Sequence, residues 1–93
     1  MYGPAANVKS IVDKDGAVLL NGARNEITTL DAMGGYVWRR IEMGMSKREI
    51  VSHLVETTGE NTATVSSDID ALFEGLLLRQ LLVTMSDDPA VNL

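Results

Sequence analysis

The sequence predicts an α+β domain in which a three-stranded antiparallel sheet precedes three helices. Short runs with strand character fill residues 8–30 and are separated by turn residues. From residue 31 to about residue 79, apolar side chains instead recur at the three- and four-residue spacing of amphipathic helices. Strands followed by helices in this order give a winged-helix-like arrangement.

The first two strands form a predicted hairpin. Residues 8–12 alternate apolar and polar side chains, as a strand at the edge of a small sheet does. Residues 13–16 (Asp-Lys-Asp-Gly) supply the turn, where Gly16 can adopt a positive φ. Residues 17–21 are almost continuously apolar, so we expect the second strand to be flanked on both sides by other elements.

The third strand is predicted at residues 26–30. Its mixed composition, with polar Glu26, Thr28 and Thr29, is typical of an edge strand that leaves one row of backbone N–H and C=O groups unpaired. Two connections from the second strand fit the residues. Asn21-Gly22 suits a two-residue type I′ turn, and a longer loop over residues 21–25 is the alternative.

A first helix is predicted over residues 32–42, with Asp31 as its N-cap and Gly44 as its terminator. Gly34 and Gly35 each cost about 1 kcal/mol in a helix interior, which suggests that another backbone passes close by. The expected inward side chains, with Trp38 beside them, are Met33, Val37 and Ile41.

The second helix begins at a capping box, Ser46 with Glu49, and runs to about Thr57. Gly59 ends it, and residues 60–64 are the expected connecting loop. Its buried face is predicted to hold Ile50, Val51, Leu54 and Val55.

The third helix is predicted to start near residues 65–67 and to run to about Arg79. Its apolar stripe comprises Ile69, Leu72, Phe73 and Leu76. Leu77 and Leu78 lie off this stripe and face either a partner, a second copy of the chain or nothing in particular. The segment 81–83 then packs back on the core.

Composition limits the chain to one small domain with one core, since 93 residues are 45% hydrophobic. We expect residues 1–7 to be a flexible N-terminus, residues 8–84 the domain and residues 85–93 a flexible tail. Cysteine is absent and no window has the length of a membrane span or signal peptide, which indicates a cytoplasmic protein.

Charge argues against nucleic acid and membrane partners. The net charge is −5, which repels phosphate backbones and anionic lipid surfaces. The basic pairs Arg39-Arg40 and Lys47-Arg48 stand at the end of one helix and the start of the next. We interpret them as solvated helix ends in preference to a docking patch for an acidic partner.

No group of residues predicts catalysis, a metal or a cofactor. His53 is the only imidazole and has no second ligand at helical spacing. No serine lies in a nucleophile elbow, and Gly34-Gly35 lacks the spacing of a phosphate-binding loop. We therefore expect a non-catalytic domain that binds another molecule.

In order and spacing, the chain resembles the PqqD-like family, the leader-peptide-binding modules (RiPP recognition elements) of ribosomal peptide-modification pathways. The resemblance covers about residues 8–83. The residues that carry it are Leu19-Leu20, Leu30-Asp31, Gly34, Val37-Trp38, Glu49-Ile50, Asp68-Ile69 and Leu81-Leu82-Val83.

The family register bears on two backbone positions. It places a left-handed residue at Asn25, which favours the longer loop over residues 21–25. Relatives usually end the third helix with glycine where this chain has Gln80. Either Gln80 adopts a left-handed cap or the helix ends differently.

The resemblance implies that the leader segment of a precursor peptide adds as an extra strand to the third strand, beside the third helix. A separate modifying enzyme, namely a protease, cyclase or radical enzyme, would then act on the presented peptide. Stand-alone modules of this kind serve lasso-peptide and pyrroloquinoline quinone biosynthesis. The predicted peptide-binding residues are Glu26, Ile27, Thr28, Thr29, Leu30, Asp68, Ile69, Leu72, Leu76 and Arg79.

Two other functions fit the element order. A winged-helix DNA-binding regulator needs a basic recognition helix, whereas residues 65–80 carry three acids, Asp68, Asp70 and Glu74, against Arg79. A scaffold or dimerisation domain is permitted by Leu77 and Leu78. We expect a monomer or a weak homodimer.

Overall fold

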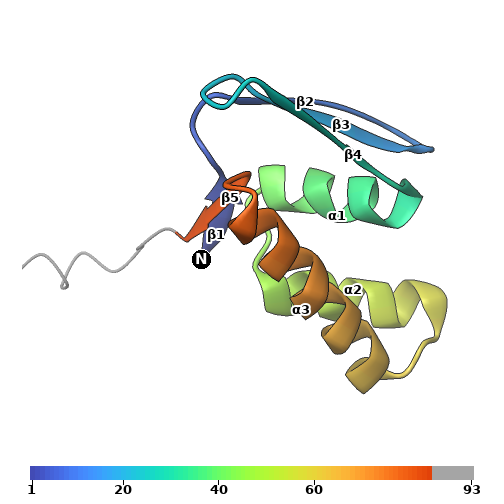
Figure 1. Ribbon diagram of the computed structural model, residues 1–93. Helices are drawn as coiled ribbons and strands as arrows, with labels where there is room; N and C mark the ends of the chain where they lie inside the picture. Colours follow the sequence, from blue (N-terminus) through green and yellow to red (C-terminus); the bar gives the residue numbers. More distant parts are fainter. Residues whose placement is uncertain (85–93) are drawn as a thin grey trace, which may run out of the picture.

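The computed structural model describes residues 1–84 and places a three-stranded sheet over three helices (Figure 1). Strands β2 (Val8–Asp13), β3 (Gly16–Asn21) and β4 (Glu26–Leu30) form an antiparallel sheet in the order β2-β3-β4. Helices α1 (Ala32–Glu42), α2 (Lys47–Thr58) and α3 (Thr62–Leu78) follow, and β5 (Leu82–Thr84) ends the described chain. The predicted α+β class, winged-helix-like with sheet before helices, is confirmed.

The N-terminus differs from its predicted flexibility. Residues Tyr2–Pro4 form a strand, β1, that pairs antiparallel with β5 and aligns Gly3 with Val83. The Tyr2 ring packs edge-on against Phe73, with centroids 5.0 Å apart. This aromatic contact and the ladder hydrogen bonds hold a segment that a glycine and a proline suggested would be loose. The expected tail, residues 85–93, lies outside the described residues.

The third helix starts earlier than predicted. Asn61, inside the supposed loop, is the N-cap, and its side chain accepts a hydrogen bond from the Ala63 N–H (2.8 Å). The capping box of α2 forms as predicted, with Ser46 and Glu49 bonded reciprocally (3.1 and 2.9 Å). One asparagine is therefore sufficient to start a helix within a polar run whose composition predicts a loop.

Loop backbones agree with two expectations. The β3–β4 connection is the longer loop, with Asn25 left-handed at φ 54°. Gln80 also adopts the left-handed conformation, at φ 60°, and ends α3. The buried Asn21 side chain joins these two sites, because its oxygen accepts from Ala23 and Arg24 while its amide donates to the Gln80 carbonyl at 3.5 Å.

Gly35 shows why α1 tolerates glycine in its first turns. A Cβ added there would lie 2.6 Å from the Gly16 carbonyl carbon, so the sheet backbone rests directly on the helix. At Gly34 a Cβ would lie 2.9 Å from the Leu30 Cβ. The predicted close backbone approach is confirmed, and it fixes how the sheet sits on α1.

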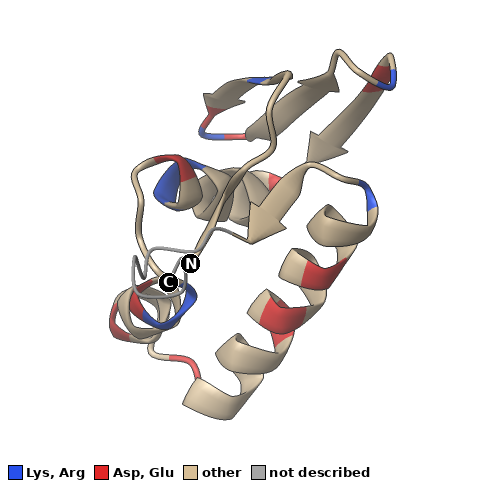
Figure 2. Cartoon of the chain, turned by 90° about the vertical axis from the view of Figure 1, so that its left-hand side faces the viewer, with Lys and Arg blue, Asp and Glu red and all other residues tan. Residues whose placement is uncertain are grey.

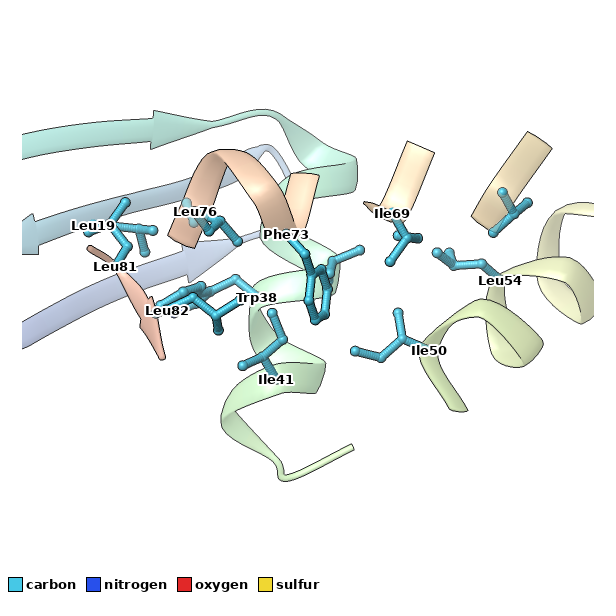
Figure 3. Packing of buried hydrophobic residues seen from close by; sticks show 13 residues of the cluster. Leu19, Trp38, Ile41, Ile50, Leu54, Ile69, Phe73, Leu76, Leu81 and Leu82 are labelled. Carbon is cyan, nitrogen blue, oxygen red and sulfur yellow. The ribbon is translucent and has the colours of Figure 1, made fainter. Parts of the chain in front are cut away.

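The core lies between the inner face of the sheet and the three helices (Figure 3). Val37, Trp38 and Ile41 are buried as predicted, whereas Met33 is 47% exposed. The Trp38 side-chain N–H is buried and has no hydrogen-bond partner among residues 1–84. The other fully or nearly fully buried apolar residues include Leu19, Ile50, Leu54, Ile69, Phe73, Leu76, Leu81 and Leu82.

Strand β3 has a strand on each edge and α1 against its inner face. Neighbouring strands cover both its edges, and its inward side chains Ala17 and Leu19 are buried. Val18 and Leu20 face outward and are 42% and 40% exposed. The expectation of cover on both sides is thus wrong for the outer face, over which no helix of residues 1–84 lies (Figure 1).

Candidate peptide-binding site

The free edge of β4 can be assigned residue by residue. The Gly22 N–H donates to the Asn7 carbonyl (2.8 Å), in the register that pairs Val8 with Asn21. Because hydrogen-bonded pairs alternate along an antiparallel ladder, the odd-numbered residues 17–21 of β3 bond to β4. Within β4, residues 26, 28 and 30 therefore face β3. The N–H and C=O groups of Ile27 and Thr29 point to the other edge of β4, with which no strand within residues 1–84 pairs.

A groove of about 220 Å³ follows this edge between β4 and α3. Its strand wall is made by Thr28, Thr29 and Leu30, and Arg79 stands at its end. Its helix wall is made by Ala71, Leu72, Gly75 and Leu76. The groove therefore places unpaired backbone groups beside an apolar helix surface, which is the arrangement that strand addition needs.

A second and larger hollow, of about 550 Å³, adjoins the groove at Leu72. It lies among the start of α1, the end of α2 and the first half of α3. Its apolar lining includes Leu54, Val65 and Ile69, and its carboxylates come from Asp31, Glu60 and Asp68. An extended chain leaving the groove could continue into this acidic, apolar space.

The predicted peptide-binding residues do not all line the same groove. Thr28, Thr29, Leu30, Leu72, Leu76 and Arg79 line the groove. Asp68 and Ile69 line only the adjoining hollow, and Ile69 is 2% exposed and belongs mainly to the core.

Glu26 and Ile27 lie outside the groove. Glu26 pairs with Arg24 at the start of β4 (2.9 Å). The Ile27 side chain is 70% exposed on the outer sheet face, so this residue offers the groove only its backbone.

Two groove residues were missed by the sequence analysis, Ala71 and Gly75. A Cβ added at Gly75 would meet nothing within 4 Å, so this glycine leaves open space on the helix wall. A glycine inside a helix destabilises it relative to alanine, so Gly75 itself is the sequence feature that could have indicated this part of the groove. Its presence opposite a free strand edge fits the close approach of a guest backbone.

The acids of α3 do not form one acidic face. Asp70 pairs with Lys47 of α2 (2.5 Å), and this hydrogen bond raises the pKa of the lysine. Asp68 instead lines the hollow beside α1. Figure 2 shows red segments spaced along α3 with blue only at its end. The charge on this helix is unsuited to phosphate contacts.

Leu77 and Leu78 have different surroundings. Leu77 is half-buried and packs against the core, whereas Leu78 is 75% exposed. His53 is exposed and bonds through Nδ1 to the Tyr36 hydroxyl (2.5 Å). Among residues 1–84, no three His, Asp or Glu side chains are grouped to hold a metal ion. Over the same range, no helix has the length and apolar character to cross a membrane.

Comparisons with known proteins agree with the predicted resemblance. Residues 16–82 match the family described as coenzyme PQQ synthesis protein D (PqqD). Since this match spans more than half of the chain, the chain belongs to the PqqD family. No curated protein matches the sequence.

Two solved structures share the fold. TbiB1 in complex with the TbiA(beta) leader peptide is 27% identical, with a TM-score of 0.84, over 91% of this chain and 99% of that chain. Lasso peptide synthetase B1 complexed with the leader peptide is 19% identical, with a TM-score of 0.80, over 89% of this chain and 98% of that one. Both are described with a peptide bound.

Proposed function

We propose that the chain captures the leader segment of a ribosomally made precursor peptide by adding it as a strand to β4. The observation that carries this proposal is the unpaired edge of Ile27 and Thr29 beside the apolar wall of α3. Membership of the PqqD family and the leader peptides named with both structural neighbours support it. Backbone hydrogen bonds would give register, and the groove side chains would give selectivity.

The chain itself carries out no chemistry in this proposal. It presents the bound leader to a separate protease, cyclase or radical enzyme, in the cytoplasm, in lasso-peptide or pyrroloquinoline quinone biosynthesis. We expect it to act as a monomer or weak homodimer. The acids along α3 and the net charge of −5 favour this role over that of a DNA-binding regulator.

The proposal is tested by titrating the labelled protein with the leader half of a precursor encoded beside it. We expect amide shifts at residues 26–30 and along α3. The N–H groups of Ile27 and Thr29 should exchange rapidly in the free protein and become protected in the complex. Shifts confined to the outer sheet face or to α2 would exclude the groove.

A pair of proline variants tests the edge itself. Thr29→Pro removes an outward N–H from β4 without breaking the β3–β4 ladder, so it should weaken leader binding at least tenfold. Ser10→Pro removes an equivalent outward N–H from β2, at the opposite edge, and should leave the affinity unchanged. Equal affinities of the two variants would refute strand addition to β4.

A further inference from the structure

The helix-end pair Arg39-Arg40 lies beside another concave surface, on the β2 side of the sheet, opposite the leader groove at β4. A hollow of about 320 Å³ lies between the β2–β3 turn and α1. We call it the cationic hollow, and its lining comprises Val12, Asp13, Lys14, Ala32, Tyr36, Arg39 and Arg40. Three cations thus surround one carboxylate in a chain whose net charge is −5.

Within the described residues, both guanidinium groups of the cationic hollow are positioned by partners other than carboxylates. Arg40 stacks over the Tyr36 ring at 4.4 Å, and Arg39 donates to the Val12 carbonyl at 3.5 Å. The Tyr36 hydroxyl is itself held by His53 (2.5 Å). Holding side chains in place before binding lowers the entropy that a ligand must offset.

Within residues 1–84, the nearby acids form no ion pair with these cations. Asp13 accepts the Asp15 N–H (2.8 Å), and Glu42 accepts the Ser10 hydroxyl (2.7 Å). In the described part of the chain, the ion pairs are Arg24 with Glu26 and Lys47 with Asp70. None involves Lys14, Arg39 or Arg40.

We propose that the cationic hollow binds an acidic segment of a partner protein, with two or more carboxylates close together in sequence. Planar guanidinium groups match carboxylates in bidentate geometry, and the Tyr36 ring adds an apolar wall. A nucleic acid fits less well, because its phosphates extend beyond the hollow over a chain whose net charge is −5, whereas a short acidic segment ends within the hollow.

The position of the cationic hollow indicates which partner this is. It borders β2, whereas the leader groove borders β4, and β3 lies between them. Adjacent strands are about 4.8 Å apart, so the two edges are about 10 Å apart and both sites can be filled together. Resting on the proposed function, we infer that the acidic segment belongs to the enzyme that receives the leader.

The probe for this inference is an acetylated hexaglutamate peptide, titrated into the labelled protein at low ionic strength. We expect amide shifts at residues 12–14 and 36–40, reversed by added salt. Arg40→Glu should weaken binding roughly tenfold, and Arg40→Lys should weaken it less, because charge remains but stacking is lost. Arg48→Glu, which makes the same charge change on α2, should leave the affinity unchanged.

Three results would overturn the inference. The first is an equal loss in Arg40→Glu and Arg48→Glu, and the second is tighter binding of a short DNA duplex at residues 36–40. The third is self-association of the free protein that Arg40→Glu abolishes, which would assign the cationic hollow to a second copy. The leader titration is a separate readout: Arg40→Glu should bind the leader normally. Failure of the unchanged protein to bind the leader would refute the proposed function without affecting the hexaglutamate result.

Discussion

The two edges of the three-stranded sheet differ in what lies beside them. At the β2 edge, side chains of α1 reach the strand, where Arg39 bonds to the Val12 carbonyl and Glu42 bonds to the Ser10 hydroxyl. At the β4 edge, the outward groups of Ile27 and Thr29 face a groove. An exposed edge invites pairing with any extended chain. Partial cover on one side and an apolar groove on the other would direct a guest strand to β4.

The largest expected effect concerns the contact between the sheet and α1, on which both edges depend. Gly35→Ala places a Cβ 2.6 Å from the Gly16 backbone and should cost about 3 kcal/mol of unfolding free energy, since the sheet must lift from α1. Chemical denaturation measures this. Gly75→Ala is the matched control, because an added Cβ there meets nothing within 4 Å and should stabilise the helix by about 1 kcal/mol. Similar effects of both substitutions would mean that the sheet does not rest on Gly35.

The next effect is confined to the β4 edge. Gly75→Leu should fill the groove and reduce leader affinity at least tenfold, while the protein stays folded and gains helix propensity. Calorimetric titration measures the affinity and thermal unfolding measures the stability. Leu78→Ala changes an exposed position of the same helix outside the groove, so it should bind the leader normally. A Gly75→Leu protein with full affinity would place the guest elsewhere.

A smaller effect concerns the loop and cap that hold β3 and α3 together. Gln80 is left-handed at φ 60°, and Gln80→Gly should raise the unfolding free energy by about 1 kcal/mol. Asn25→Gly should raise it less, because asparagine tolerates this conformation better than glutamine. Urea unfolding distinguishes the two variants, and a loss of stability in Gln80→Gly would contradict the assigned cap.

The smallest expected effect depends on pH and leaves both edges intact. Hydrogen bonds from the backbone and hydroxyl of Ser46 lower the pKa of Glu49. Its contribution is therefore present above the pKa of the unfolded chain and is lost as pH falls through the lower folded value. Unfolding measured between pH 6 and pH 3 should show a steeper loss for the unchanged protein than for Glu49→Gln. Parallel curves would exclude this contribution.

Local signals predicted most of the fold. The turn at residues 13–16, the capping box and the glycine of closest approach each act on neighbouring residues, and each is found where expected. The β1–β5 pair could not be predicted, because it joins opposite ends of the described chain and depends on the Tyr2–Phe73 contact. Nor could the sequence predict that the N–H of Thr29 points away from β3, because this depends on the hydrogen-bonding register set by the Asn7–Gly22 bond between β2 and β3.

The elements of the candidate site could be predicted from local patterns, but the directions of its side chains could not. An edge strand and a helix stripe are visible as patterns, and both contribute to the groove. The direction of each side chain depends on which face of the strand packs on the core, so the sequence predicts Ile27 as a binding residue although its side chain is exposed outside the groove. Gly75 carries no side chain to suggest a contact, and its role emerges only from the space opposite it.

The pairing of β1 with β5 affects how the domain folds during synthesis. Strand β1 leaves the ribosome before β5, so it can pair only after residues 82–84 have emerged. Until then the Phe73 ring lacks its Tyr2 neighbour, and the closing of so long a loop costs entropy. Ordering of the first strand should therefore be among the last events of folding, so a nascent chain halted before residue 82 would retain an uncovered aromatic surface.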